Sequence, residues 1–119
     1  MYNRITPEIA DKLRAIVGKN RFFMGEDIDP NYSHDEMPIY GSKMPEAVCE
    51  VETTEEVAAI MRLCNENRIP VTPRGAGTGL VGGAVPLQGG VIICTVRMNR
   101  ILGYDLKNLC VHTQVGVLL

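Results

Sequence analysis

Glycine dominates one stretch of this chain, from Pro70 to Gly90, and that stretch limits the possible folds more than any other feature. Apolar runs flank it, Ile69 to Val71 before and Val91 to Val96 after. Residues without a β-carbon permit positive φ angles and close approach of the backbone to another group. We therefore predict a loop between two strands whose main-chain N–H groups turn inward to cradle an anion. The glycines stand at positions 75, 77, 79, 82, 83, 89 and 90.

Two known nucleotide-binding loops fit this stretch poorly. Residues 77–82 match the spacing GxGxxG of the dinucleotide fold, but that motif must be followed directly by a helix. Pro86 and the pair Gly89 and Gly90 interrupt any such helix. The NTPase loop needs Lys-Ser or Lys-Thr after its glycines, and neither pair follows here. A flexible linker is the remaining alternative, although the stretch lacks the serine-rich composition of linkers.

The string PVTPRGAGTGLVGGAVP, followed by GGVIICTVRMNRI, resembles the flavin loop of FAD-binding domains of the para-cresol methylhydroxylase and vanillyl-alcohol oxidase type. Upstream, YSHDEMPIYGSKMPEAVCEVETTEEVAAIMRLCNENRIPV is similar to the same group. The chain is most similar to the glycolate oxidase flavoprotein subunit and to D-lactate or D-2-hydroxyacid dehydrogenases. This resemblance implies FAD as cofactor, oxidation of a small 2-hydroxy acid to the 2-oxo acid, and delivery of electrons to an accepting protein or carrier.

The resemblance also implies which residues contact the cofactor. Gly75, Gly77 and Gly79 are expected to turn main-chain donors toward the diphosphate, with the hydroxyl of Thr78 beside them. For Arg74, neutralising the diphosphate and pairing with a neighbouring acid both remain open. We predict no catalytic and no metal-ligating residue in this chain. The predicted cofactor-binding set is Pro73, Arg74, Gly75, Ala76, Gly77, Thr78, Gly79, Leu80, Gly83, Ala84 and Gly116.

Thr78 stands where some members of the resembled family carry a histidine that attaches the flavin covalently. Threonine cannot make that bond, so we predict non-covalent binding of FAD. The substitution Gly77→Val is expected to abolish flavin retention while the protein stays folded, because the added branches would fill the space of the diphosphate.

Helical signals occur twice. Thr6 and Pro7 form a helix start, apolar residues recur at helical spacing after them, and Gly18 is a stop. Thr53 with Glu56 three positions later is a capping box, which starts a second amphipathic helix.

Strand signals occur both before and after the second helix. The strands before and after that helix predict a βαβ unit with parallel strands, and the last two strands predict a hairpin that begins a second, mainly antiparallel sheet. The fold class is therefore α+β: an N-terminal helix, the βαβ unit, the glycine-rich loop and the start of the second sheet of a truncated FAD-binding domain. The expected strands are 47–51, 69–72, 91–96, 101–105 and 109–115.

The segment 29–45 contains three prolines, which exclude a long helix or a central strand, so we expect it to cross the surface. His34 beside Asp35 would suggest a general base only with a third group in a substrate pocket, and a surface histidine is favoured. The acids of 21–29 are expected in a solvated loop. We divide the chain into this N-terminal helix and extended segment, 1–45, and the N-terminal part of the FAD-binding domain, 46–119.

Composition excludes several classes of partner. The 119 residues carry a net charge of −2, which argues against nucleic acid. No apolar run approaches the roughly 18 residues of a membrane span, and no signal-peptide core is present, so we expect a cytoplasmic protein. The cysteines lie in apolar segments without metal-ligand spacing, and we expect them to be buried thiols. They are Cys49, Cys64, Cys94 and Cys110.

The sequence stops at Leu119 without a closing polar segment, and the resemblance implies that the catalytic residues lie beyond that point. Two alternatives stay open. One is the flavin domain of another branch, such as an alcohol oxidase or the flavin subunit of a molybdenum hydroxylase. The other is a non-catalytic fragment or interaction module that self-associates through unpaired strand edges.

Overall fold

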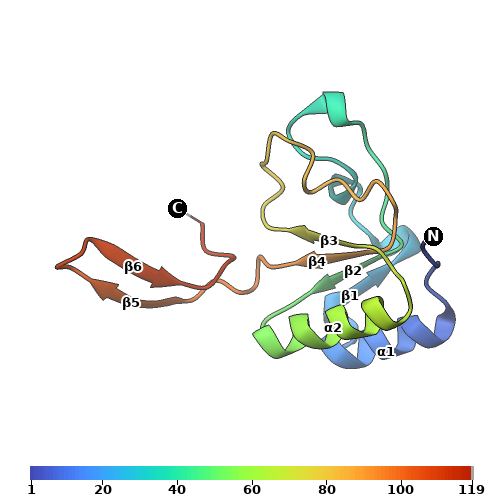
Figure 1. Ribbon diagram of the computed structural model, residues 1–119, viewed down its shortest axis with the longest axis horizontal. Helices are drawn as coiled ribbons and strands as arrows, with labels where there is room; N and C mark the ends of the chain where they lie inside the picture. Colours follow the sequence, from blue (N-terminus) through green and yellow to red (C-terminus); the bar gives the residue numbers. More distant parts are fainter. Residues whose placement is uncertain (119) are drawn as a thin grey trace.

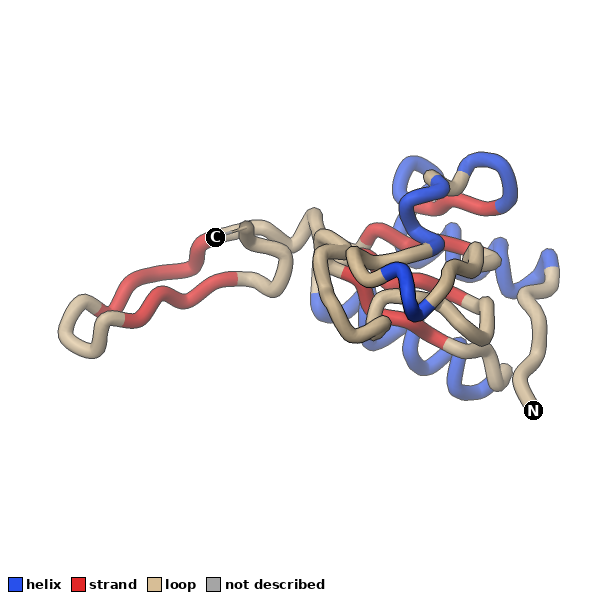
Figure 2. Tube along the Cα trace, turned by 90° about the horizontal axis from the view of Figure 1, so that it is seen from above, coloured by secondary structure: helices blue, strands red, loops and turns tan. Residues whose placement is uncertain are grey.

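The structure is a computed structural model and describes residues 1–118. Two helices lie on one face of a four-stranded sheet, and irregular segments that include the glycine-rich stretch cover the other face (Figure 1). A separate two-stranded hairpin extends away from these layers (Figure 2). Within the described residues, no helix combines the length and the apolar character needed to cross a membrane.

Both helices begin where the capping residues predicted. Helix α1, Pro7–Val17, starts after Thr6, whose side-chain oxygen accepts a hydrogen bond from the amide of Ile9 at 3.3 Å. Helix α2, Thr54–Glu66, starts after Thr53, which caps the amide of Glu56 at 3.1 Å. The short 3-10 helices are η1 Lys19–Arg21, η2 Gly25–Asp27, η3 Pro30–Ser33 and η4 Pro38–Tyr40.

The main sheet has the strand order β1-β2-β4-β3. The central strand β4 runs parallel to both β2 and β3, so the predicted parallel βαβ unit is present with β4 inserted between its strands. Strand β1 pairs antiparallel with β2 in a region where we expected only a loop. Its three residues are too few to show an alternating pattern. The bounds are β1 Phe22–Met24, β2 Ala47–Glu50, β3 Val71–Arg74 and β4 Val91–Cys94.

Strand β4 is buried along its whole length and divides the core into two parts. Because successive side chains of a strand point to opposite faces, Val91 and Ile93 pack toward the helices, whereas Ile92 and Cys94 pack beneath the irregular layer. The sheet is thus covered on both faces, and the irregular layer rests on an apolar floor.

The hairpin consists of β5, Ile101–Asp105, and β6, Cys110–Thr113, paired antiparallel as predicted. Both strands are largely exposed, since no second layer covers them among the described residues. Cys110 is therefore exposed, and the expectation that all the cysteines are buried is wrong for this one.

Candidate cofactor site

The glycine-rich segment leaves the carboxyl end of β3, Val71–Arg74, and returns into β4, Val91–Cys94 (Figure 1). Within residues 1–118, the main-chain N–H groups of residues 75–81 donate no hydrogen bond. Farther along, the amides of Gly82, Val85 and Gly89 are bonded. The first half of the segment therefore presents a run of unused donors at the carboxyl edge of a parallel sheet, where open sheets bind ligands.

A cleft of about 660 Å³ lies beside these donors. The glycine-rich segment forms one wall, and the chain between β4 and β5 together with the residues after β6 forms the other. Its volume is in the range of small-molecule and cofactor sites. The cleft brings together four residues of the predicted set, which are Gly75, Ala76, Thr78 and Gly116.

Gly116 enters the cleft through a close contact between backbones. Its N–H donates to the carbonyl of Met98 at 2.8 Å, and a β-carbon at this position would overlap the carbonyl oxygen of Thr95. Only glycine therefore lets the chain after β6 close the wall against the end of β4.

Arg74 lies beneath the glycine-rich segment, with 7% of its surface exposed. Its guanidinium donates to the carbonyl oxygens of Asn31 at 2.9 Å, His34 at 2.8 Å and Ala84 at 3.4 Å. The ion pairs of the described residues do not include Arg74, so the alternative that it pairs with an acid is wrong. Its positive charge lies under the loop, where it favours an anion on the other side.

Gly77 packs directly against Arg74. A β-carbon at position 77 would overlap the guanidinium, 2.6 Å from Cζ, and the φ angle of Gly77 is +76°. The expectation for Gly77→Val is therefore wrong in its reason: the added side chain would first displace Arg74, so a loss of flavin could not be ascribed to a filled ligand space alone.

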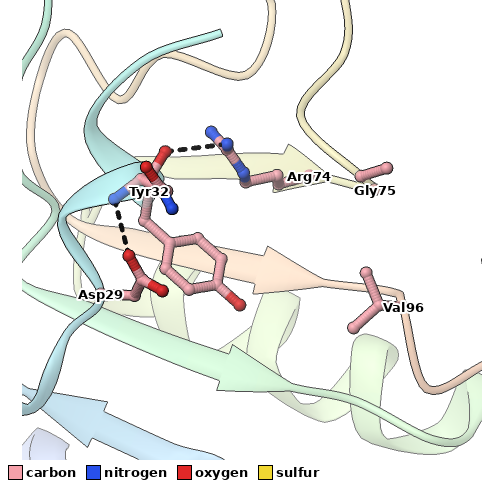
Figure 3. A pocket seen from close by; sticks show the side chains of 7 residues that line it. Asp29, Tyr32, Arg74, Gly75 and Val96 are labelled. Atoms are coloured by element: carbon pink, nitrogen blue, oxygen red, sulfur yellow. Dashed lines mark hydrogen bonds between the residues drawn. The ribbon is translucent and has the colours of Figure 1, made fainter.

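A smaller pocket of about 200 Å³ adjoins the cleft and shares Gly75, Ala76 and Val96 with it (Figure 3). The ring of Tyr32 lies under the guanidinium of Arg74, 5.3 Å from Cζ to the ring centroid, and its hydroxyl donates to Cys94 Sγ at 3.4 Å. Burial and the Cys94 thiol raise the pKa of this phenol, so Tyr32 stays neutral.

Sequence reasoning did not assign Asp29, Asn31, Tyr32 or Val96 to this site. The similarity of YSHDEM to the resembled family was the available signal, and it gave no role to any side chain.

The remaining predicted residues lie outside the cleft. Pro73 faces an apolar groove of about 380 Å³ between the sheet and helix α2, Thr54–Glu66. Leu80 is 58% exposed, and β-carbons at Gly79 and Gly83 would have no protein atom within 4 Å. Ala84 accepts from Arg74 through its carbonyl and so supports the loop from within.

These residues fit a bound diphosphate. The unused amides supply hydrogen-bond donors, and Arg74 beneath them supplies positive potential. A β-carbon at Gly75 would meet only Thr95 Oγ1 at 4.0 Å, so little in the protein itself requires a glycine there. Among residues 1–118, no group of three or more His, Cys, Asp and Glu side chains is placed to hold a metal ion.

The FAD binding domain family matches residues 45–119. D-lactate dehydrogenase of Anaerostipes hadrus is 55% identical over 118 residues, which are 99% of this chain and 25% of that protein. Glycolate oxidase subunit GlcD of Bacillus subtilis (strain 168) is 38% identical over 114 residues, 96% of this chain and 24% of the relative. The solved structure of p-cresol methylhydroxylase with substrate bound matches with a TM-score of 0.69 at 27% identity, over 88% of this chain and 22% of that one.

This chain thus spans about a quarter of the length of the curated relatives it matches. The structural match confirms the predicted α+β class, with a parallel-stranded sheet followed by an antiparallel one.

Proposed function

We propose that the glycine-rich segment of this chain, which belongs to the FAD binding domain family, holds the diphosphate of FAD. One observation carries the proposal: the N–H groups of residues 75–81 have no partner within residues 1–118, and Gly75, Ala76 and Thr78 of this run line the cleft. A diphosphate accepts several hydrogen bonds at once, and consecutive amides meet that demand without a full positive charge in the wall.

Each part of the site has a separate task in this proposal. The amides of residues 75–81 bind the diphosphate, the hydroxyl of Thr78 adds a donor, and Gly116 keeps the opposite wall close. The predicted contacts of Pro73, Leu80, Gly83 and Ala84 remain part of the proposal, although these residues lie outside the cleft. FAD, when bound, supplies the acceptor for an electron pair.

For the protein that contains this chain, we propose an oxidoreductase that converts a 2-hydroxy acid of the glycolate or D-lactate type to the 2-oxo acid. The names of the two relatives, D-lactate dehydrogenase and glycolate oxidase subunit, support this class of substrate. Electrons would pass to an accepting protein or carrier. The proposal assigns no catalytic residue to this chain, places the protein in the cytoplasm, and takes FAD to be bound reversibly because Thr78 offers no imidazole for a covalent bond.

The visible absorption spectrum of the full-length natural protein tests the cofactor assignment. We expect flavin absorbance that co-elutes with the protein in gel filtration and is released by acid into the supernatant. A colourless protein that takes up no added FAD contradicts the proposal, and flavin that stays attached after acid contradicts reversible binding.

A second candidate function is self-association through the hairpin. Tyr104 and Val111 pair across its strands and are 69% and 47% exposed, and Leu106 and Leu109 at its tip are 80% and 90% exposed. A two-stranded ribbon is marginal without a covering layer, so a second copy of the chain would stabilise it. A colourless oligomer would favour this candidate over the flavin site.

A further inference from the structure

Asp35 is a buried carboxylate that the sequence left without a role. Only 5% of its surface is exposed, and its two oxygens accept from two main-chain amides: Oδ1 from Met37 at 2.8 Å and Oδ2 from Gly82 at 2.7 Å. The first bond is local, whereas the second joins positions 47 residues apart. Asp35 therefore ties the proline-rich segment 29–45 to the middle of the glycine-rich segment.

Arg74 makes a second connection between the same two segments. Its guanidinium joins the carbonyl oxygens of Asn31 and His34, in the proline-rich segment, to that of Ala84 in the glycine-rich segment. One further main-chain bond, from Glu36 N to the carbonyl of Gly79 at 3.2 Å, lies between these two anchors. The segment 29–45 thus holds the glycine-rich segment directly at residues 79 and 82, and Arg74 links Ala84 to that same segment.

The anchors leave the unused donors free. Neither Asp35 nor Arg74 bonds to an amide of residues 75–81, which the proposed function assigns to the diphosphate. A segment this rich in glycine loses much conformational entropy when it is ordered, and a ligand that has to order it binds more weakly. Anchors that order it beforehand remove that cost from the binding step.

We propose that Asp35 and Arg74 are positioning residues that hold the glycine-rich segment in its cofactor-binding form before FAD arrives. This inference rests on the proposed function for its consequence, since it explains how the amides of residues 75–81 are presented to the diphosphate. Asp35 gives the sharper test, because its role depends on two acceptors facing two donors.

Asp35→Asn separates this role from simple filling of space. Asparagine has the same size but offers one acceptor oxygen and one NH₂ donor, so one of the two amides would face a donor. Asp35→Glu keeps both acceptors but shifts them by one methylene in a buried site. Glu56→Gln is the matched control: it makes the same change of charge on the helix face of the sheet, where Glu56 pairs with Arg21 at 2.9 Å and is 14% exposed (Figure 1).

The experiment uses the full-length natural protein stripped of flavin. We would measure the dissociation constant of added FAD by flavin fluorescence, hydrogen exchange of the hydrogen-bonded loop amides of Gly82, Val85, Leu87 and Gly89 without FAD, and the urea midpoint of unfolding. For Asp35→Asn we expect an increase of about ten-fold or more in the dissociation constant and faster exchange of the loop amides. Asp35→Glu should give smaller shifts of both quantities, and it serves as the test if Asp35→Asn does not fold.

Glu56→Gln should lower the urea midpoint while FAD affinity and loop exchange stay as in the unsubstituted protein. The proposal is overturned if Asp35→Asn changes neither quantity, or if Glu56→Gln reproduces both changes. If the unsubstituted protein binds no FAD, the proposed function fails. The positioning role is then decided by exchange alone: faster loop exchange in Asp35→Asn supports it and unchanged exchange overturns it.

Discussion

The guanidinium of Arg74 occupies the space into which a side chain on Gly77 would project. The same guanidinium bonds three main-chain carbonyls of the surrounding segments. Gly77 is therefore required by the packing of this chain itself, independently of any ligand.

We predict that Gly77→Ala destabilises the flavin-free protein by about 2 kcal/mol or more, because of strain at positive φ and the displaced arginine. Urea unfolding measures this loss. Gly83→Ala is the control, since its β-carbon would have no protein atom within 4 Å and the φ angle there is not in the left-handed region. Equal midpoints for the two variants would show that Arg74 does not fill this space.

Gly75→Val tests the ligand side of the loop. Gly75 lines the cleft, and its β-carbon would meet only Thr95 Oγ1 at 4.0 Å. We expect the free energy of unfolding of the apoprotein to change by less than about 1 kcal/mol, and FAD affinity to fall by about ten-fold or more as the branches enter the diphosphate space. Gly103→Val, in the exposed strand β5, Ile101–Asp105, is the control and should leave FAD affinity unchanged. Flavin titrations that give the same affinity for both variants would contradict the cradle.

Alkaline pH should destabilise the fold through its buried thiols. Burial raises the pKa of Cys49 to about 12 and that of Cys64 to about 11, from an ordinary value of 9.0. Above about pH 9 the unfolded thiols lose protons that the folded thiols keep, so the free energy of unfolding falls as pH rises toward the folded pKa, by up to about 1.4 kcal/mol per pH unit for each thiol.

Cys49→Ala removes one of these titrations and should give a shallower fall between about pH 9 and pH 11 in urea unfolding. The exposed Cys110 provides the comparison: Cys110→Ala should keep the slope of the unsubstituted protein. The assignment fails if the slope for Cys49→Ala is as steep as that for Cys110→Ala.

The N-cap of helix α2, Thr54–Glu66, has a measurable share in stability. The side-chain oxygen of Thr53 accepts from the amide of Glu56 at 3.1 Å. Thr53→Ala should cost about 1 kcal/mol in urea unfolding, because that amide loses its partner. Thr53→Ser keeps the acceptor and should recover most of the loss. A serine variant as unstable as the alanine variant would point to lost methyl contacts instead.

The exposed hairpin predicts concentration-dependent association of this chain. Replacing the cross-strand pair Tyr104 and Val111 by lysine should shift sedimentation profiles toward the monomer, because like charges on neighbouring strands disfavour stacking of the ribbon. Ile39→Lys, at a residue outside the hairpin that is 79% exposed, serves as comparison and should leave association unchanged. Identical profiles for both variants would remove the hairpin as the contact surface.

Local signals in the sequence predicted the elements that depend on local chemistry. The caps at Thr6 and Thr53 act on amides three positions away, and both helices begin where those residues predicted. The resemblance carried by the glycine-rich string is confirmed by the family match and by the relatives. The structure brings Gly75, Thr78 and Gly116 of the predicted set to one cleft, and their contact with the cofactor stays a prediction.

Features that depend on distant contacts could not be predicted. Asp35 accepts from an amide 47 positions away, and no local pattern indicates such a partner. The interpretation of Arg74 stayed open for the same reason, since its acceptors are carbonyl groups of three separated residues. Strand β1, Phe22–Met24, owes its conformation to its pairing with β2, Ala47–Glu50, rather than to its own three residues.

Strand β4, Val91–Cys94, lies between β2, Ala47–Glu50, and β3, Val71–Arg74, although it follows both along the chain. The four-stranded sheet is incomplete until β4 has been inserted. Until then, the irregular layer lacks the apolar sheet face against which it packs. Contacts between such distant positions form slowly in a folding chain. Retention of FAD by the proposed site would accordingly require this central strand to be in place.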